Sequence, residues 1–183
     1  MPDKGEFSLS ELHETIRGGE RVLIRRARSE DMALYPDFLR NVSAEDLRLR
    51  FFGGITALSA AQIDKLNELD YRYEMAFIAL DEGTGHMLGL VRLIDEPDEK
   101  TAQFAILVRS RLKGRGLGWL LMRHVIDYAK EKGLRRVYGD VLAENTTMLQ
   151  MCAELGFHAE DIGSNIRRVV LNLENIGARH VCL

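Results

Sequence analysis

The stretch Phe104-Ala-Ile-Leu-Val-Arg-Ser-Arg-Leu-Lys-Gly-Arg-Gly-Leu-Gly-Trp119 decides the fold. Its first part belongs to a segment, Ala102 to Arg109, in which apolar side chains recur at every second position, as in a β-strand. Its second part is the glycine-rich run Lys113 to Gly118, followed by leucines at helical spacing that end at Gly133. The sequence therefore predicts a strand, a tight loop and a helix in direct succession.

A loop of this kind, between a strand and a helix, is suited to holding a phosphate group. Glycines let the backbone approach a ligand closely, and the unpaired N–H groups at a helix start favour negative charge. A Rossmann fingerprint would need glycine where Trp119 stands, and a P-loop would need Gly-Lys-Ser/Thr after four spacer residues. We therefore expect a pyrophosphate here, with a turn that merely reverses the chain as the competing interpretation.

Apolar spacing and turn residues along the rest of the chain predict further helices and strands. Together with the unit above, the predicted order of elements is β, helices, βββ, α, β, α, β, β. The class is α+β or mixed α/β. Helices are expected to begin at Ser29, Ser43 and Ser59 and to run from Asn145 to Leu155; further strands are Val22–Arg25, Ala76–Leu80, Met87–Ile94, Val137–Val141, Phe157–Glu160 and Arg168–Leu173.

The N-terminal residues carry a helix signature of their own. Ser8-Leu-Ser-Glu11 fits a capping box, Leu12 and Ile16 follow on one helical face, and Gly18-Gly19 would end the helix. We therefore predict a helical extension over residues 1–20, one main domain over 21–173 and a tail over 174–183.

Composition narrows the classes of function. The chain has 183 residues, a net charge of −3 and two cysteines, Cys152 and Cys182, which match no metal-ligand spacing. No general basic field favours nucleic acid, and no segment approaches the ~20 apolar residues of a membrane span or resembles an export signal. We expect a cytoplasmic protein that needs no metal and binds neither nucleic acid nor membrane.

At the glycine-rich loop the chain resembles the GNAT superfamily, whose signature is Gln/Arg-x-x-Gly-x-Gly/Ala after a strand. Lys113 stands in place of the usual Gln or Arg. The resemblance extends over about residues 21–173, with Asn145 and Leu155-Gly-Phe157 at the place of the family's second signature. Three segments are similar to the acetyltransferase domain of bacterial protein-lysine acetyltransferases of the Pat type, namely Asp46–Phe52, Glu74–Phe77 and Phe104–Arg109.

The resemblance implies a GNAT fold, with a twisted, mostly antiparallel sheet flanked by helices and a splayed parallel strand pair. Acetyl-CoA would lie between the strand ending at Val108 and the strand at Val137. The residues implied to contact it are Ile106, Leu107 and Val108 along the pantetheine, Lys113, Gly114, Arg115, Gly116, Leu117, Gly118 and Trp119 at the pyrophosphate, and Asn145. For Asn145, a helix-capping role is the alternative.

The resemblance also marks two departures at catalytic positions. Pat-type enzymes carry a general-base Glu where this chain has Gln103, and many GNAT enzymes carry a proton-donating Tyr where it has Cys152. Cys152 is therefore a candidate acid, or else a small apolar residue of the core. Glu74 is the candidate replacement base, acting through water, or else a surface carboxylate at a strand start.

The leading hypothesis is an enzyme that transfers acetyl from acetyl-CoA directly to a primary amine, with a protein lysine as the first acceptor to test. A small amine or a polyamine remains an alternative acceptor, and a non-catalytic acyl-CoA-binding module is the rival class. Arg48 and Arg50 are interpreted as a charged helix face, or as lining of the acceptor cleft. A homo-oligomer built through the terminal segments is left open.

Overall fold

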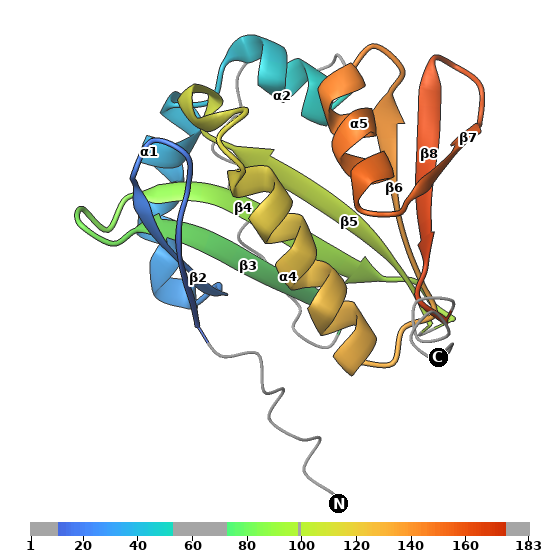
Figure 1. Cartoon of the computed structure of the whole chain (residues 1–183), viewed down its shortest axis with the longest axis horizontal. Coiled ribbons are helices and arrows are strands. Elements are labelled where there is room, and N and C mark those ends of the chain that lie inside the picture. The colour runs from blue at the N-terminus through green and yellow to red at the C-terminus, as the bar shows by residue number, and fades with distance from the viewer. Residues whose placement is uncertain (1–10, 53–72, 99, 175–183) are drawn as a thin grey trace, which may run out of the picture.

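The computed structural model describes residues 11–52, 73–98 and 100–174; the helix expected from Ser59 lies outside them. The described strands form one sheet in the order β1-β2-β3-β4-β5-β6-β8-β7, in which only β5 and β6 run parallel (Figure 1). This confirms the predicted mixed α/β class with a mostly antiparallel sheet. The strands are β1 Leu12–Thr15, β2 Arg21–Arg26, β3 Glu74–Asp81, β4 Met87–Asp95, β5 Thr101–Val108, β6 Arg136–Leu142, β7 His158–Asp161 and β8 Ile166–Asn172.

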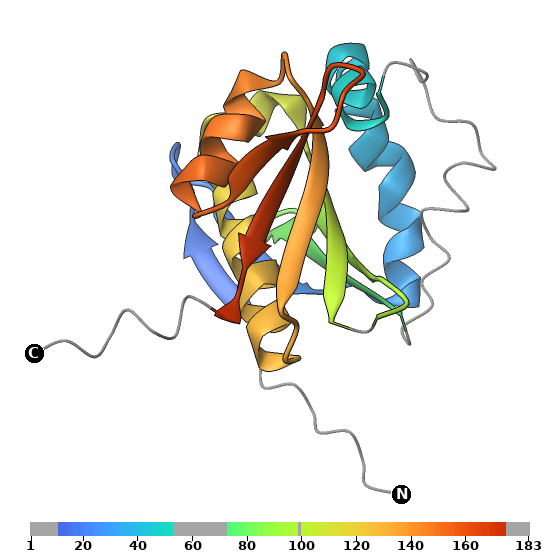
Figure 2. The same cartoon turned by 90° about the vertical axis from the view of Figure 1, so that its right-hand side faces the viewer.

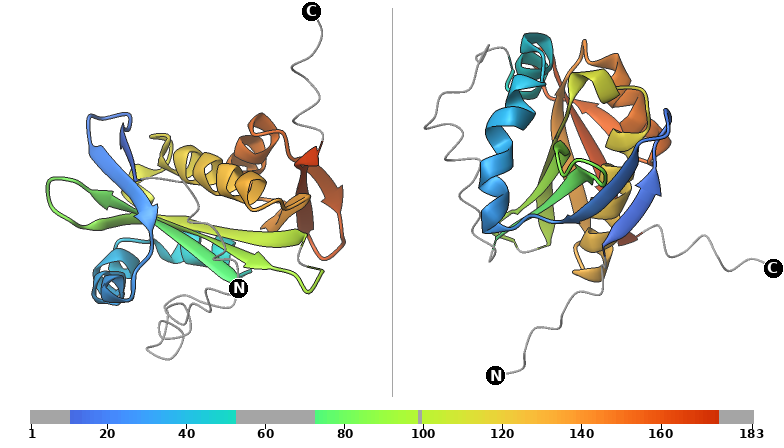
Figure 3. Two further views of the ribbon diagram at one scale, coloured as in Figure 1. Left: turned by 90° about the horizontal axis from the view of Figure 1, so that it is seen from below. Right: turned by 90° about the vertical axis from the view of Figure 1, so that its left-hand side faces the viewer.

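Helices cover both faces of this sheet, as the views in Figures 2 and 3 show. Helices α4 and α5 lie on one face, and α1 and α2 lie on the other. The helical segments are η1 Ser29–Leu34, α1 Tyr35–Arg40, α2 Ala44–Arg50, η2 Ser110–Leu112, α4 Leu117–Glu131 and α5 Thr146–Glu154.

Each face of the sheet packs its own hydrophobic core. Successive strand residues point to opposite faces, so Phe77 packs with Leu121 and Val125 of α4, while Ile78 packs with Phe38 of α1. Because both faces are covered, β3 and β4 are nearly continuous apolar runs rather than alternating ones.

The helix predicted before residue 20 is wrong over the described part of that segment. Leu12–Thr15 is the strand β1, which pairs antiparallel with β2. Gly18 and Gly19 both have positive φ and form the hairpin turn, closed by a 3.0 Å hydrogen bond from the Gly19 N–H to the Ile16 carbonyl. A Gly-Gly pair can end a helix or reverse a hairpin, and here cross-strand pairing selects the hairpin.

The parallel pair β5–β6 comes apart soon after it forms. Its residue pairs run only from Thr101↔Arg136 to Gln103↔Tyr138, whereas β6 stays paired with β8 as far as Leu142. Phe104 lies where the two strands begin to separate, and its ring lies against Gly139 of β6. A Cβ atom at Gly139 would lie 2.5 Å from the Phe104 Cζ. The sheet is thereby opened between β5 and β6, as predicted.

Substitution of Gly139 tests this packing. Gly139→Ala should lower stability by about 1–3 kcal/mol, the usual cost of overpacking, because the new methyl group overlaps the Phe104 ring. Thermal denaturation measures the loss. In a Phe104→Leu background the same substitution should cost clearly less, since the ring is gone. An equal cost in both backgrounds would contradict the proposed contact.

Candidate functional site

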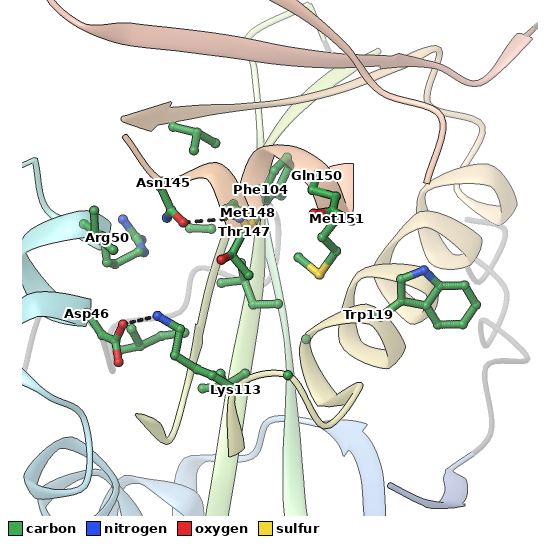
Figure 4. A pocket seen from close by; sticks show the side chains of 18 of the residues that line it. Asp46, Arg50, Phe104, Lys113, Trp119, Asn145, Thr147, Met148, Gln150 and Met151 are labelled. Atoms are coloured by element: carbon green, nitrogen blue, oxygen red, sulfur yellow. Dashed lines mark hydrogen bonds and ion pairs between the residues drawn. The ribbon is translucent and has the colours of Figure 1, made fainter. Parts of the chain in front are cut away.

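A cavity of about 870 Å³ occupies the opening between β5 and β6, and residues from both faces of the sheet line it. Its volume is in the range of ligand pockets. On the α4/α5 side the lining includes Phe104, Ile106, Val108, Gly118, Trp119, Asn145, Met148 and Met151; on the α1/α2 side it includes Asp46, Leu49, Arg50, Phe52, Ile94, Gln103, Ala105 and Leu107 (Figure 4).

Strand β5 presents unpaired backbone groups to this cavity. The Arg109 N–H donates to the Leu88 carbonyl of β4 at 2.9 Å. Because backbone groups alternate in direction along an antiparallel strand, Leu107 also faces β4, while Ile106 and Val108 face the opening. The expected backbone role therefore fits Ile106 and Val108, whereas Leu107 contributes its side chain to the lining.

The glycine-rich loop borders the cavity with a row of free amides. Gly114 and Gly116 have φ of 75° and 93°, and the space where their Cβ atoms would lie is open. Within the described residues, no protein acceptor takes the N–H of Gly116, Leu117, Gly118 or Trp119. These amides stand at the start of the 15-residue helix α4, so a phosphate fits the loop in charge and shape.

Two ion pairs anchor the loop to neighbouring elements. The Arg115 side chain pairs with Glu20 at 2.8 Å, and its carbonyl accepts from the Arg17 N–H, so Arg115 points to the β1–β2 hairpin. Lys113 pairs with Asp46 of α2 (Figure 4). Leu117 is buried in the core. The cavity lining thus includes Lys113 but neither the Arg115 nor the Leu117 side chain.

Asp46 is a well-satisfied anion at the edge of the cavity. Burial acts to raise its pKa, but hydrogen bonds from Lys113, Ser110 and Ser43 outweigh burial and lower the pKa from its ordinary value. Ser43 also caps α2 by accepting from the Asp46 N–H at 3.1 Å, at the residue where the sequence predicts a helix start. The charge of Asp46 is therefore used to fasten α2 to the loop.

Asn145 caps a helix, as the alternative interpretation expected, and also lines the cavity. Its side-chain oxygen accepts from the Met148 N–H at 3.2 Å and caps α5, and the residue also lines the cavity (Figure 4). The cap uses the amide oxygen, and the side-chain NH₂ group is the remaining donor.

The proposed acid Cys152 does not suit that role. Its side chain is 1% exposed, packs in the hydrophobic core and is outside the cavity lining. Burial raises the pKa of the thiol to about 12, which makes it a poor proton donor near neutral pH. Cys152 is a small apolar core residue, which was the alternative interpretation.

The structure also separates the other two catalytic candidates. Gln103 lines the cavity at the last β5–β6 residue pair. Glu74 lies outside the lining, at the start of β3, where its carboxylate pairs with buried Arg92. An ion pair of this kind commits the carboxylate to Arg92 and leaves Glu74 without the access that a base needs.

Arg50 is the lining residue that the sequence pattern undervalued. It projects from α2 toward the cavity (Figure 4). The centroid of the Phe51 ring lies 4.8 Å from the guanidinium carbon of Arg50. Burial lowers the pKa of Arg50 to about 10, and the nearby positive charge of Arg92 adds to this effect. The sequence pointed to this lining role only through the apolar neighbour Phe51 and through the position of Arg50 near the end of a predicted helix.

The model of the acetyltransferase (GNAT) family matches residues 42–157. Acetyltransferase PA5475 of Pseudomonas aeruginosa is 35% identical over 146 residues, which are 79% of this chain and 78% of that protein. The chain belongs to the GNAT family. It is thus an acetyltransferase, which favours the enzyme over the non-catalytic module.

Solved structures of GNAT proteins share the fold. The GNAT domain of S. lividans PAT superposes with a TM-score of 0.80 at 24% identity, over 89% of this chain and 97% of that one. Spermidine N-acetyltransferase from Vibrio cholerae, solved with CoA and spermine, gives 0.68 at 20% identity, over 84% and 96%. Acetyltransferase Pat of Mycolicibacterium smegmatis is 27% identical over 151 residues, which are 81% of this chain and 45% of that longer protein.

Within the described residues, no helix is both long enough and apolar enough to cross a membrane. Those residues also hold no group of three or more His, Cys, Asp or Glu side chains arranged to bind a metal ion.

Alanine substitutions at two glycines with similar positive φ angles test whether the loop binds the phosphate. Gly116→Ala and Gly133→Ala each place a side chain at a positive φ, 93° and 81°, with open space around it. Each should cost about 1–2 kcal/mol of stability. Only Gly116→Ala should weaken CoA binding several-fold in isothermal titration calorimetry, because Gly133 lies at the far end of α4. Equal CoA affinity in the two variants would refute the loop as the phosphate site.

Proposed function

We propose that this GNAT protein transfers an acetyl group from acetyl-CoA to a primary amine across the opening between β5 and β6. The observation that carries the proposal is that one cavity is lined from both faces of the sheet. Donor and acceptor then meet in the opening, the donor on the α4/α5 side and the amine on the α1/α2 side. Such an arrangement accelerates transfer chiefly by positioning.

The residues on the donor side suit acetyl-CoA. Amides of Gly116 to Trp119 would hold the pyrophosphate, and the outward-facing backbone groups of Ile106 and Val108 would bind the pantetheine amides. Apolar Met148 and Met151 flank the same space. The thioester supplies the acyl group, and backbone N–H groups of β5 are the available donors for its carbonyl oxygen.

Proton transfer in this cavity relies on water in our proposal. Lining carboxylates of the described residues are Asp46, paired with Lys113, Asp140, hydrogen-bonded to Arg168 at 2.7 and 2.9 Å, and Glu154, which accepts from Gln150. The amide of Gln103 accepts a hydrogen bond but takes up no proton, so it orients the amine. As the N–C bond forms and the C–S bond breaks, water relays the proton from the amine to the departing CoA thiolate, which leaves as the thiol.

The charge of the lining favours a monoamine over a polyamine. A polycation needs several free carboxylates, but Asp46 and Asp140 are already neutralised by Lys113 and Arg168. This leaves Glu154 as the one lining carboxylate of the described residues without a cationic partner. Arg50 adds a positive charge on the acceptor side. We therefore keep a protein lysine as the first acceptor to test and add free lysine as a second. We propose that the reaction takes place in the cytoplasm.

Release of CoA thiol from acetyl-CoA tests the proposal. The purified chain is offered a lysine-containing peptide, free lysine and spermidine in parallel. We expect release above the hydrolysis blank with the lysine acceptors and a lower kcat/KM with spermidine. Preference for spermidine would contradict the acceptor class, and no release with any primary amine would contradict the transfer itself.

A Gln103→Glu variant probes the proton path in the same assay. A carboxylate at this lining position would be a base within the cavity, so the rate below pH 8 should rise relative to the parent chain. The matched control is Gln150→Glu, which makes the same change at an exposed lining position on α5. An unchanged or lower rate for Gln103→Glu would remove Gln103 from the path of the proton.

A further inference from the structure

The α1/α2 side of the cavity carries a positive charge that no described carboxylate balances. Arg50 lines the main cavity and also, together with Arg92, a small adjoining pocket of about 20 Å³. Arg92 is buried and pairs with Glu74, and no described carboxylate forms an ion pair with Arg50. Glu74 thus balances the charge of Arg92, and the charge of Arg50 is left without a carboxylate among the described residues.

The acidic residues of α2, and Glu144 before α5, are paired with side chains other than Arg50. Asp46, one helical turn before Arg50, is bound by Lys113, Ser110 and Ser43. Glu45 and Glu144 both bind Arg48, at 2.7 and 3.0 Å. These pairs fix α2 to the glycine-rich loop and to the turn before α5, and they leave the Arg50 guanidinium facing the cavity (Figure 4).

A guanidinium in a partly buried cavity costs free energy unless an anion reaches it. The planar fork of arginine matches a carboxylate through two parallel hydrogen bonds. The guanidinium lies over the Phe51 ring, 4.8 Å from its centroid, and none of the hydrogen bonds among the described residues uses an Arg50 N–H group. The chemistry of this end of the cavity is therefore that of a carboxylate-binding subsite.

We propose that Arg50 binds a carboxylate carried by one of the two substrates, so that the preferred acceptor is a primary amine with a carboxylate or the preferred donor is an acyl-CoA with a terminal one. The subsite lies on the α1/α2 side of the cavity, where Arg50 also lines the small adjoining pocket together with Ala105 and Leu107. The inference rests on the proposed acyl transfer and specifies its substrate.

The acceptor arm of the test compares 4-aminobutanoate with 4-aminobutanamide, which differ in charge but hardly in shape, using acetyl-CoA as donor. The donor arm compares succinyl-CoA with acetyl-CoA, using 4-aminobutanamide as acceptor. We expect kcat/KM to favour the carboxylate at least about tenfold in one arm. Arg50→Gln should abolish that ratio, Arg50→Lys should keep part of it, and Arg40→Gln, which removes an exposed charge on α1, should leave it intact.

A binding measurement separates this inference from the transfer activity. Calorimetry with CoA present compares 4-acetamidobutanoate with 4-acetamidobutanamide, and succinyl-CoA is compared with acetyl-CoA without an amine. A carboxylate preference that Arg50→Gln removes supports the subsite even if no amine is acetylated. Equal binding and equal rates within both pairs, with acetyl transfer intact, would overturn the subsite and leave the proposed function standing.

Discussion

The structure depends on one constraint, the short parallel pairing of β5 and β6. Three residue pairs hold the two strands together, and then the Phe104 ring, seated against Gly139, marks where they part. Each strand has a second partner, β4 or β8, so the sheet survives the separation. The opening exposes backbone groups that a continuous sheet would have paired, and these groups become available to a ligand.

Helix α2 lies across one end of this opening and contacts the segments that follow β5 and β6. Asp46 binds Lys113 and Ser110 after β5, and Arg48 binds Glu144 after β6. Exposed ion pairs contribute little to stability one by one, but these set where α2 lies and therefore where Arg50 points. The place of Arg50 in the cavity is thus fixed by contacts between residues about 65 to 95 positions apart in the sequence.

Local patterns predicted what local physics decides. The glycine-rich loop, the cap at Ser43 and the strand pattern of β5 depend on neighbours within a few residues, and the structure bears them out. Gly18-Gly19 was misread because the choice between helix end and hairpin depends on pairing with β2. The catalytic roles predicted for Cys152 and Glu74 failed for the same reason. Cys152 is buried in the core and Glu74 pairs with Arg92, and both are tertiary contacts that a local pattern does not contain. The charge environment of Arg50 was equally invisible in the sequence.

Acetyl-CoA is proposed to occupy the opening between β5 and β6, along the loop amides. Amide hydrogen exchange with and without CoA is the measurement that tests this placement. We expect slower exchange at Gly116 to Trp119, Ile106 and Val108 when CoA binds, with β1 and β7 unchanged. Protection confined to other segments, or binding without protection of these amides, would contradict it.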